Sequence, residues 1–572
     1  FDENNNIDNS LSEETPSIEY TEDDNNIVID DIPNDFNEWY GVLSSDEGGL
    51  GWSMWGSTPY DYSLNLLRTT YFDTNSITLF NLTKKFLLSR AKKPTNKNII
   101  QKTNLEEDQL VFFREKIKIM SNLGATDEIS KLTEALPLEF KSKDFMETLI
   151  SLRDNETDIS FLCNNVLNKN FDPVIDIEKR KKLIACNIAL KKFDEASLAI
   201  DLLENDSQKS IDYIEFTRPL LDSNNIKSNN DFNNSKIEGL NKKIISLADY
   251  QVAQKVFSEN EKTLDKIIFD MKLYDKSVQI EALERLVNIG VYSTTSLKNE
   301  YMSYYNYIID TNGIENQEDI AQGNSAFIRA KLFFLINNTS SEIERAKYLN
   351  LLWAKADDKE IQMAIFNITS EVILTIIPKQ ELSWFIYPAT KALIISNELT
   401  AAKKWLFYMS DDLYNRAALD INFCKFLIIL YIKDPSLMDL NEKIPETDYL
   451  LNRLSNSPET NDSDMFKILV TLRSLEHKFN KSFFEKYYGS ENIKELSNKK
   501  VQLNNLYFNL EQAVNYSNLA ETVLLSLNLL NSRVEGNNDY YSLYKPLNAL
   551  YKIGLKKIAR DYATELNLDF LN

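Results

Sequence analysis

"KKLIACNIALKKFDEASLAIDLL", residues 181–203, has the apolar spacing of two helices joined by a short polar break. Its second half repeats an apolar residue at every third or fourth position, which places these residues on one face of a helix. They are Phe193, Ala196, Ile200 and Leu203. The small residue of the series permits a close approach between the helices, and the larger ones fill the space between them. The stretch therefore predicts a helical hairpin.

Two further stretches repeat this pattern. "SNELTAAKKWLFYM" carries it in the middle of the chain and "LNALYKIGLKKIARDYATEL" near the C-terminus. Their residues are Leu399, Ala402, Leu406 and Met409, and then Leu555, Ile558 and Tyr562 after a turn at Gly554. The three copies resemble the second helix of a tetratricopeptide repeat. Because their spacing along the chain is irregular, we predict an all-α fold, an irregular α-solenoid of tetratricopeptide-like hairpins.

The composition agrees with a mostly helical chain. Only 13 Gly and 13 Pro occur in 572 residues, of which 43% are hydrophobic. Strands need turn residues every few positions, whereas helices joined by short polar loops do not. The low content of turn residues therefore favours helices over strands.

Shifts in composition divide the chain into seven parts. These are a disordered acidic tail (1–35), a Gly/Trp-rich anchor segment (36–62), a helical-repeat block (63–221), an Asn-rich loop (222–238), a second block (239–438), a second loop (439–465) and a C-terminal block (466–572). The second loop is predicted from Pro445, Pro458 and the polar run "SPETNDSD".

The negative charge of the chain is unevenly placed. The formal net charge is −22, and residues 1–67 contain sixteen acidic residues and no Lys or Arg. Such a tail has too little apolar surface to fold, so we expect it to be disordered. Phosphate binding requires a basic stripe, which the sequence lacks, so we expect no nucleic-acid partner.

The chain has no apolar run of the roughly 18 residues that a membrane span requires, so we expect it not to span a membrane. It begins with Phe1 instead of Met, as it would after removal of a signal segment, although an arbitrary starting point would look the same. We therefore expect a periplasmic or otherwise exported protein, with the cytoplasm as the alternative.

Three cysteines, Cys163, Cys186 and Cys424, each lie inside an apolar helical pattern. An odd number in such surroundings favours buried unpaired thiols over a disulfide framework.

The anchor segment contains "EGGLGWSMWGST" at 47–58. Between residues 39 and 56 lie five of the 13 glycines and three of the six tryptophans. The Gly51 to Gly56 spacing resembles a phosphate loop, but Ser57 stands where such a loop needs Lys. Two interpretations stay open: a structural plug packed on the first hairpin, or a docking motif for another protein. The predicted partner-binding residues are Trp39, Gly49, Gly51, Trp52, Met54 and Trp55.

Catalytic patterns are weak. Asp411 and Asp412 in "SDDLYN" approach a motif that binds magnesium diphosphate, but a second facing ligand cluster is missing and an N-cap explains either residue. His477 is the single histidine, which leaves no histidine metal cluster, and its charged neighbours favour a solvated surface position. We expect no cofactor and no metal.

Both ends of the chain resemble a family of uncharacterised, exported alphaproteobacterial proteins made of helical hairpins. The G-G-x-G-x-x-M-W part of the resemblance rests on Gly48, Gly49, Gly51, Met54 and Trp55. The L-L-S/T-x-A-x-x-P part rests on Leu87, Leu88, Ser89, Ala91 and Pro94, and the closing hairpin on Gly554, Leu555, Ala559, Arg560 and Ala563. The resemblance implies an envelope location and a helical-repeat body, but no activity.

The sequence thus predicts a non-enzymatic scaffold or adaptor of the bacterial envelope that binds an unidentified protein through its solenoid surface. One alternative is a Mg-dependent helical enzyme that acts on a diphosphate substrate through Asp411 and Asp412. Another is a glycan-binding envelope protein that uses Trp39, Trp52 and Trp55.

Overall fold

The structure is a computed structural model of the chain. It describes residues 41–92, 94, 111–136, 158–168, 177–206, 210–223, 237–312, 325–408, 412–438, 444–486, 503–532 and 540–571. The acidic tail (1–35), Trp39, Asp411 and residues 224–236 of the Asn-rich loop lie outside the described residues. Residues Asn37–Asn572 form one compact unit, so the three predicted helical blocks belong to a single body.

The described ranges contain 27 α-helices. In the first half these are α1 (Tyr60–Thr69), α2 (Ile77–Leu88), α4 (Val111–Asn122), α5 (Thr126–Glu134), α7 (Ile159–Leu167), α8 (Ile177–Ala189), α9 (Phe193–Asp206), α10 (Ile211–Ser223), α12 (Gly239–Ser246), α13 (Tyr250–Val256), α14 (Glu261–Asp270), α15 (Lys276–Asn288) and α16 (Thr294–Asn312).

The second half continues with α17 (Ala326–Asn338), α18 (Glu342–Ala354), α19 (Gln362–Leu374), α20 (Ile386–Ile395), α21 (Leu399–Phe407), α22 (Leu413–Leu419), α23 (Ile421–Lys433), α24 (Thr447–Ser455), α25 (Asp462–Ser474), α26 (Ser482–Lys486), α27 (Leu503–Asn515), α28 (Leu519–Asn531), α29 (Tyr540–Lys552) and α30 (Lys556–Leu566). Three short 3₁₀ helices are η4 (Gln380–Phe385), η5 (Pro435–Met438) and η7 (Leu568–Leu571).

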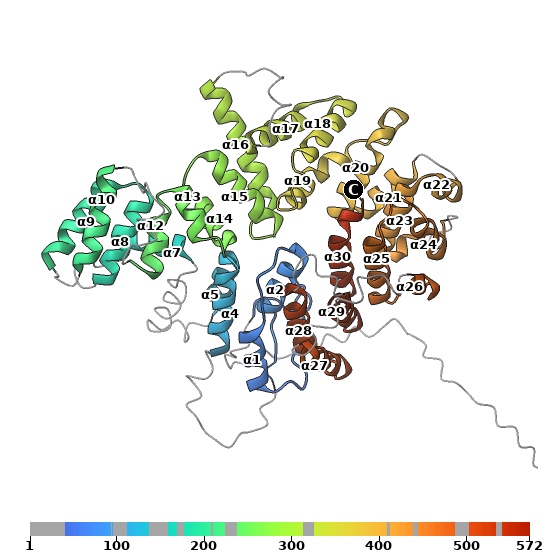
Figure 1. Ribbon diagram of the computed structural model, residues 1–572, viewed down its shortest axis with the longest axis horizontal. Coiled ribbons are helices and arrows are strands. Elements are labelled where there is room, and N and C mark those ends of the chain that lie inside the picture. The colour runs from blue at the N-terminus through green and yellow to red at the C-terminus, as the bar shows by residue number, and fades with distance from the viewer. Residues whose placement is uncertain are drawn as a thin grey trace, which may run out of the picture. The chain divides into compact units, whose positions relative to one another are not determined.

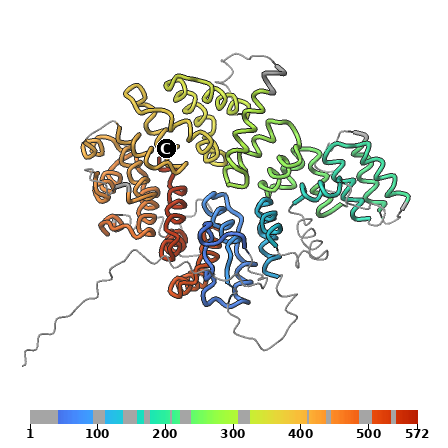
Figure 2. The backbone as a smooth tube through the Cα atoms, turned by 180° about the vertical axis from the view of Figure 1, so that it is seen from behind, coloured from blue at the N-terminus to red at the C-terminus, as the bar shows by residue number. Residues whose placement is uncertain are grey.

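The predicted all-α solenoid is confirmed. In the ranges given above no strand forms, and an isolated bridge between Leu43 and Ser89 is the one β-type pairing. Consecutive helices pack on one another along the chain, as in α8–α9, α14–α15, α20–α21 and α28–α29. The first helices, α1 and α2, also pack against α28 and α30 at the other end (Figures 1 and 2). The succession of hairpins thus returns to its start.

The three predicted hairpin patterns are confirmed at their small residues. Ala196, Ala402 and Ala559 are fully buried in α9, α21 and α30, where each helix meets the preceding one. A larger side chain at any of them would push the two helices apart. The predicted pair of helices on either side of Gly124 is also present as α4 and α5.

Eight helix ends share one turn geometry. In each, a residue with positive φ follows the helix, and its N–H and the next N–H donate to carbonyls three and five residues back. The turn residues are Gly124, Lys191, Lys272, Gly290, Asn397, Glu476, Ser517 and Gly554. Only three of the eight are glycine, so five of these turns carry a side chain in the left-handed region.

The predicted loop at 439–465 is wrong in part, because α24 (Thr447–Ser455) lies inside it and α25 begins at Asp462. Pro445 precedes α24 and Pro458 follows it, so both prolines mark the ends of a helix. Leu450, Leu451 and Leu454 are buried, and this burial stabilises a helix that the polar flanks conceal in the sequence.

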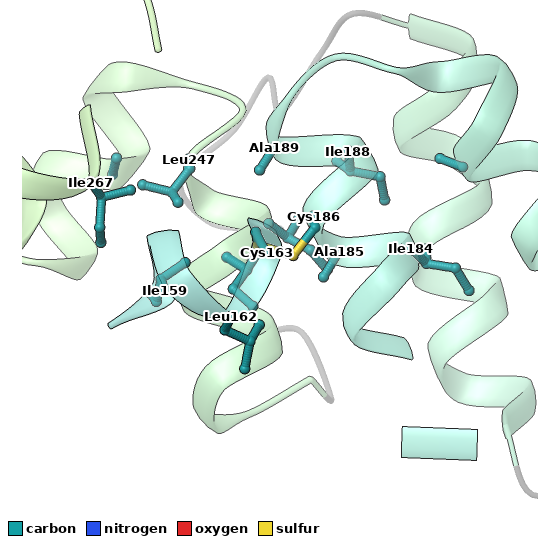
Figure 3. Close-up of a cluster of buried hydrophobic side chains, with 14 of the residues drawn as sticks. Ile159, Leu162, Cys163, Ile184, Ala185, Cys186, Ile188, Ala189, Leu247 and Ile267 are labelled. Atoms are coloured by element: carbon teal, nitrogen blue, oxygen red, sulfur yellow. A yellow bond between two sulfur atoms is a disulfide. The ribbon is translucent and has the colours of Figure 1, made fainter. Parts of the chain in front are cut away.

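The prediction of three unpaired thiols is wrong for two of them. Cys163 of α7 and Cys186 of α8 form a disulfide, with Cα atoms 5.6 Å apart, inside a cluster of buried apolar side chains (Figure 3). Cys424 is a buried free thiol, as predicted. Helical patterns indicated that all three are buried, but only the packing of α7 on α8 decides that two of them meet. Of the helices in the described ranges, none is long and apolar enough to cross a membrane.

We predict that Lys191→Gly stabilises the α8–α9 hairpin. Lys191 has φ 57°, a conformation that costs a side-chain-bearing residue roughly 1–2 kcal/mol, while glycine loses about 0.5–1 kcal/mol in backbone entropy. We expect a net gain of about 0.5 kcal/mol in the free energy of local opening, measured by hydrogen exchange of the hairpin amides. Lys192→Gly is the control: it keeps the entropy cost without relieving strain and should destabilise the hairpin.

Candidate functional site

The described part of the anchor segment runs beside the end of α2. The N–H groups of Val42 and Leu43 both donate to the carbonyl of Leu88 at 2.9 Å, and the Arg90 N–H donates to the carbonyl of Leu43 at 2.9 Å. Further along, the Leu50 N–H donates to Ser89 Oγ at 2.8 Å. The segment is therefore fixed by backbone hydrogen bonds although it contains no helix before α1.

Two of the glycines predicted as partner-binding residues are required by the fold of the segment. A Cβ atom at Gly49 would lie 2.5 Å from the carbonyl oxygen of Leu43, which leaves no room for a side chain. Gly51 has φ 96°, in the region that glycine adopts without strain. These glycines shape the backbone.

The tryptophans of the segment have different surroundings. Trp55 is 1% exposed and makes edge-to-face contacts with Phe86 of α2 and Phe112 of α4, at centroid distances of 5.8 and 5.5 Å. Met54 is also 1% exposed, whereas Trp52 is 42% exposed. Burial removes Met54 and Trp55 from the predicted partner-binding surface, and it removes Trp55 from the rings on which glycan binding would rest.

The same turn that buries Trp55 also binds α28. The Met54 carbonyl accepts a hydrogen bond from the Ala520 N–H at 2.7 Å. Asn518 Oδ1 accepts from the Ser57 N–H at 3.1 Å, and Thr58 Oγ1 donates to Glu521 at 3.2 Å. Burial raises the pKa of Glu521, and the hydrogen bonds that its carboxyl group accepts oppose this shift. The anchor segment thus joins the first hairpin to the C-terminal part of the chain.

A second set of contacts holds α2 in place. Glu565 of α30 accepts hydrogen bonds from Ser76 Oγ at 2.9 Å and from the Thr78 N–H at 3.3 Å. Lys262 of α14 forms an ion pair with Asp73 at 2.5 Å. The N-terminal helices are therefore bound both to the last helix and to the middle of the chain. Of the two interpretations of the segment, these contacts favour the structural plug.

We predict that Trp55→Ala lowers the free energy of unfolding by about 3–5 kcal/mol, because it removes a buried ring and leaves a cavity. Trp52→Ala is the matched control and should cost about 1 kcal/mol or less, because its ring is partly exposed. Urea denaturation followed by far-UV circular dichroism measures both. Equal and small losses for the two variants would contradict the plug interpretation.

The outer face of α9 carries a pair of exposed leucines. Leu198 is 63% exposed and Leu202 is 52% exposed, and their spacing of four residues places them side by side on the helix. The opposite face, with Ala196, Ile200 and Leu203, is buried against the core. The sequence analysis used only this buried face. The signal for the other face was in the same stretch, as two leucines outside the hairpin pattern.

A charged pocket of about 390 Å³ lies between α15, α17 and the connection from α18 to α19. In its wall Glu284 is fully buried and accepts hydrogen bonds from Arg329, with a closest printed separation of 2.5 Å, and from the Tyr301 hydroxyl. Arg285, also in the wall, pairs with Asp265 at 2.5 Å. These two ion pairs compensate the charges in the pocket wall and connect α14, α15 and α17.

The structure explains Asp412 as a helix cap. Its carboxylate accepts a hydrogen bond from the Asn415 N–H at 3.0 Å at the start of α22, so the capping interpretation is confirmed. In the ranges that the structure describes, no group of His, Cys, Asp and Glu side chains is arranged to hold a metal ion.

The predicted surface position of His477 is wrong. Its ring is buried against Tyr431, with a centroid distance of 4.4 Å, and its Nε2 has no hydrogen-bond partner among the described residues. The helix ends at Ser474, and the left-handed residue Glu476 then turns the chain inward. Because the helical periodicity stops there, the charged sequence neighbours of His477 do not indicate where its ring points.

We predict that His477 stays neutral down to mildly acidic pH. Burial lowers its pKa from 6.5 to about 4, and the charge of Arg560 adds to the shift. Between these values the unfolded chain binds a proton that the folded chain does not, so His477 reduces stability as the pH falls from 6.5 toward 4. An NMR titration of this single histidine measures the pKa directly. A midpoint near the ordinary value would mean that the ring is solvated.

In comparisons with known proteins, no family model, no curated protein and no solved structure matches this chain.

Proposed function

We propose that this chain is a non-enzymatic protein-binding scaffold of the bacterial envelope, and that it binds its partner through the outer face of α9. The observation that carries the proposal is the exposure of Leu198 and Leu202. The buried face of α9 already supplies what the hairpin needs for packing, so the fold leaves these two leucines unused. Apolar side chains that lie together on a surface and are surrounded by polar residues are typical of protein-binding sites.

The contacts between the two ends support a scaffold role. A solenoid whose hairpins touch only their neighbours deforms along its length. Here α28 and α30 bind the anchor segment and α2, so the first and last hairpins cannot separate without breaking these hydrogen bonds. Such a frame presents a surface helix in a fixed position, which reduces the entropy lost when a partner binds.

The disulfide supports the envelope part of the proposal. Disulfides form and persist in oxidising compartments such as the periplasm and are rare in the cytoplasm. The bond between Cys163 and Cys186 holds α7 to α8, and α8 packs directly on α9. An oxidising environment would therefore stabilise the hairpin that presents the proposed surface.

We predict that a photoreactive amino acid at position 198 crosslinks to a specific partner in cells that express the full chain. Position 419 is the matched control, because Leu419 is 80% exposed but lies on α22. Mass spectrometry of the crosslinked products should identify a protein that is captured from position 198 and not from position 419. The proposal fails if the two positions give the same products or if position 198 gives none.

A further inference from the structure

The negative charge of the helical body is concentrated in two neighbouring helices. Residues 68–572 contain 70 acidic and 64 basic residues, a net charge of −6. The sequences of α9 and α10 alone contain eight acidic residues and one basic residue, a net charge of −7. The rest of the body is therefore close to neutral, and these helices form a local negative surface.

The acidic side chains surround the exposed leucines. Asp194, Glu195, Asp201 and Glu204 of α9 are all exposed, on the same helix as Leu198 and Leu202. The one basic residue of the two helices, Arg218, pairs with Asp201 at 3.1 Å and with Glu204 at 2.6 Å.

Two carboxylates at the start of α9 remain available for binding. Asp194 and Glu195 form no ion pair within the described residues, and neither do Lys191 and Lys192 in the turn before them. A position in the first turn of a helix stabilises both carboxylates through the helix dipole. That role leaves their oxygens open to a cation from outside.

We propose that the partner segment bound by this face is a cationic amphipathic helix, an inference that rests on the function proposed above. Its apolar side would cover Leu198 and Leu202, and its Lys or Arg side chains would reach Asp194 and Glu195. The two leucines lie one turn apart and form a ridge of the kind that packs into the groove of another helix. Charge complementarity selects a basic helix over an acidic or neutral one.

The test uses the full chain and a fluorescein-labelled peptide of about 18 residues, which is about five helical turns, with leucines on one face and lysines elsewhere. A second peptide of the same pattern carries glutamate in place of lysine. Fluorescence anisotropy at about 0.05 M salt should show binding of the lysine peptide and none of the glutamate peptide. Raising the salt to about 0.5 M should weaken binding, because exposed charges are then screened.

Three variants locate the binding site. Leu198→Ser with Leu202→Ser should weaken binding by about tenfold or more, and Asp194→Asn with Glu195→Gln by about threefold, with a smaller loss on adding salt. Leu419→Ser on α22 is the control and should bind as the unchanged chain does. Because all five positions are exposed, the variants should keep their helical content, which circular dichroism verifies.

The results separate this inference from the function itself. Equal binding of both peptides, no binding of the lysine peptide, or unchanged binding by the leucine variant would each overturn the cationic helix. If one of these occurs while position 198 still crosslinks to a specific protein in cells, the scaffold function stands and its partner has another chemistry. If position 198 also gives no specific product, both proposals fail.

Discussion

The burial of Trp55 is the interaction on which the arrangement of the chain most depends. The ring fills a space between Phe86 and Phe112, and the preceding carbonyl, that of Met54, binds the start of α28. One short turn without helical structure therefore holds together the first hairpin and the C-terminal helices. In a solenoid each hairpin otherwise contacts only its neighbours, so the ends stay independent unless a segment of this kind connects them. The glycines around Trp55 follow from the same constraint, because the segment must approach the end of α2 closely.

The closing contacts separate residues that build the frame from residues that remain available. Met54 and Trp55 belong to the frame, and so do the ion pairs of Glu284 and Asp265 in the middle of the chain. Leu198 and Leu202 do not, because α9 completes its packing through the opposite face. The local excess of carboxylates around them gives the surface a sign as well as an apolar character. Both properties of α9 come from residues that contribute little to the stability of the fold.

The hairpins were predictable where a chemical signature marks them. Ala196, Ala402 and Ala559 stand where two helices approach closely, and Gly124 and Gly554 stand in left-handed turns. The same turn also occurs at Lys191, Glu476 and Ser517, where the residue type gives no sign of it. Tertiary packing on both sides holds these residues in a conformation that their side chains disfavour. This is why the repeat is regular in geometry but irregular in sequence. Among the candidate site residues, the sequence identified the anchor segment but did not decide which of its side chains are internal.

The sequence by itself determined the helical class, the apolar face of the recognised hairpins and local features such as the cap at Asp412. These depend on residues within one or two turns of each other, and so periodicity reports them. Only the tertiary structure decided that Cys163 meets Cys186, that His477 is buried on Tyr431 and that Trp55 is internal. Each of these depends on a distant segment that covers the residue. A local pattern shows which face of a helix is apolar, but it contains no information about which part of the chain will pack against that face.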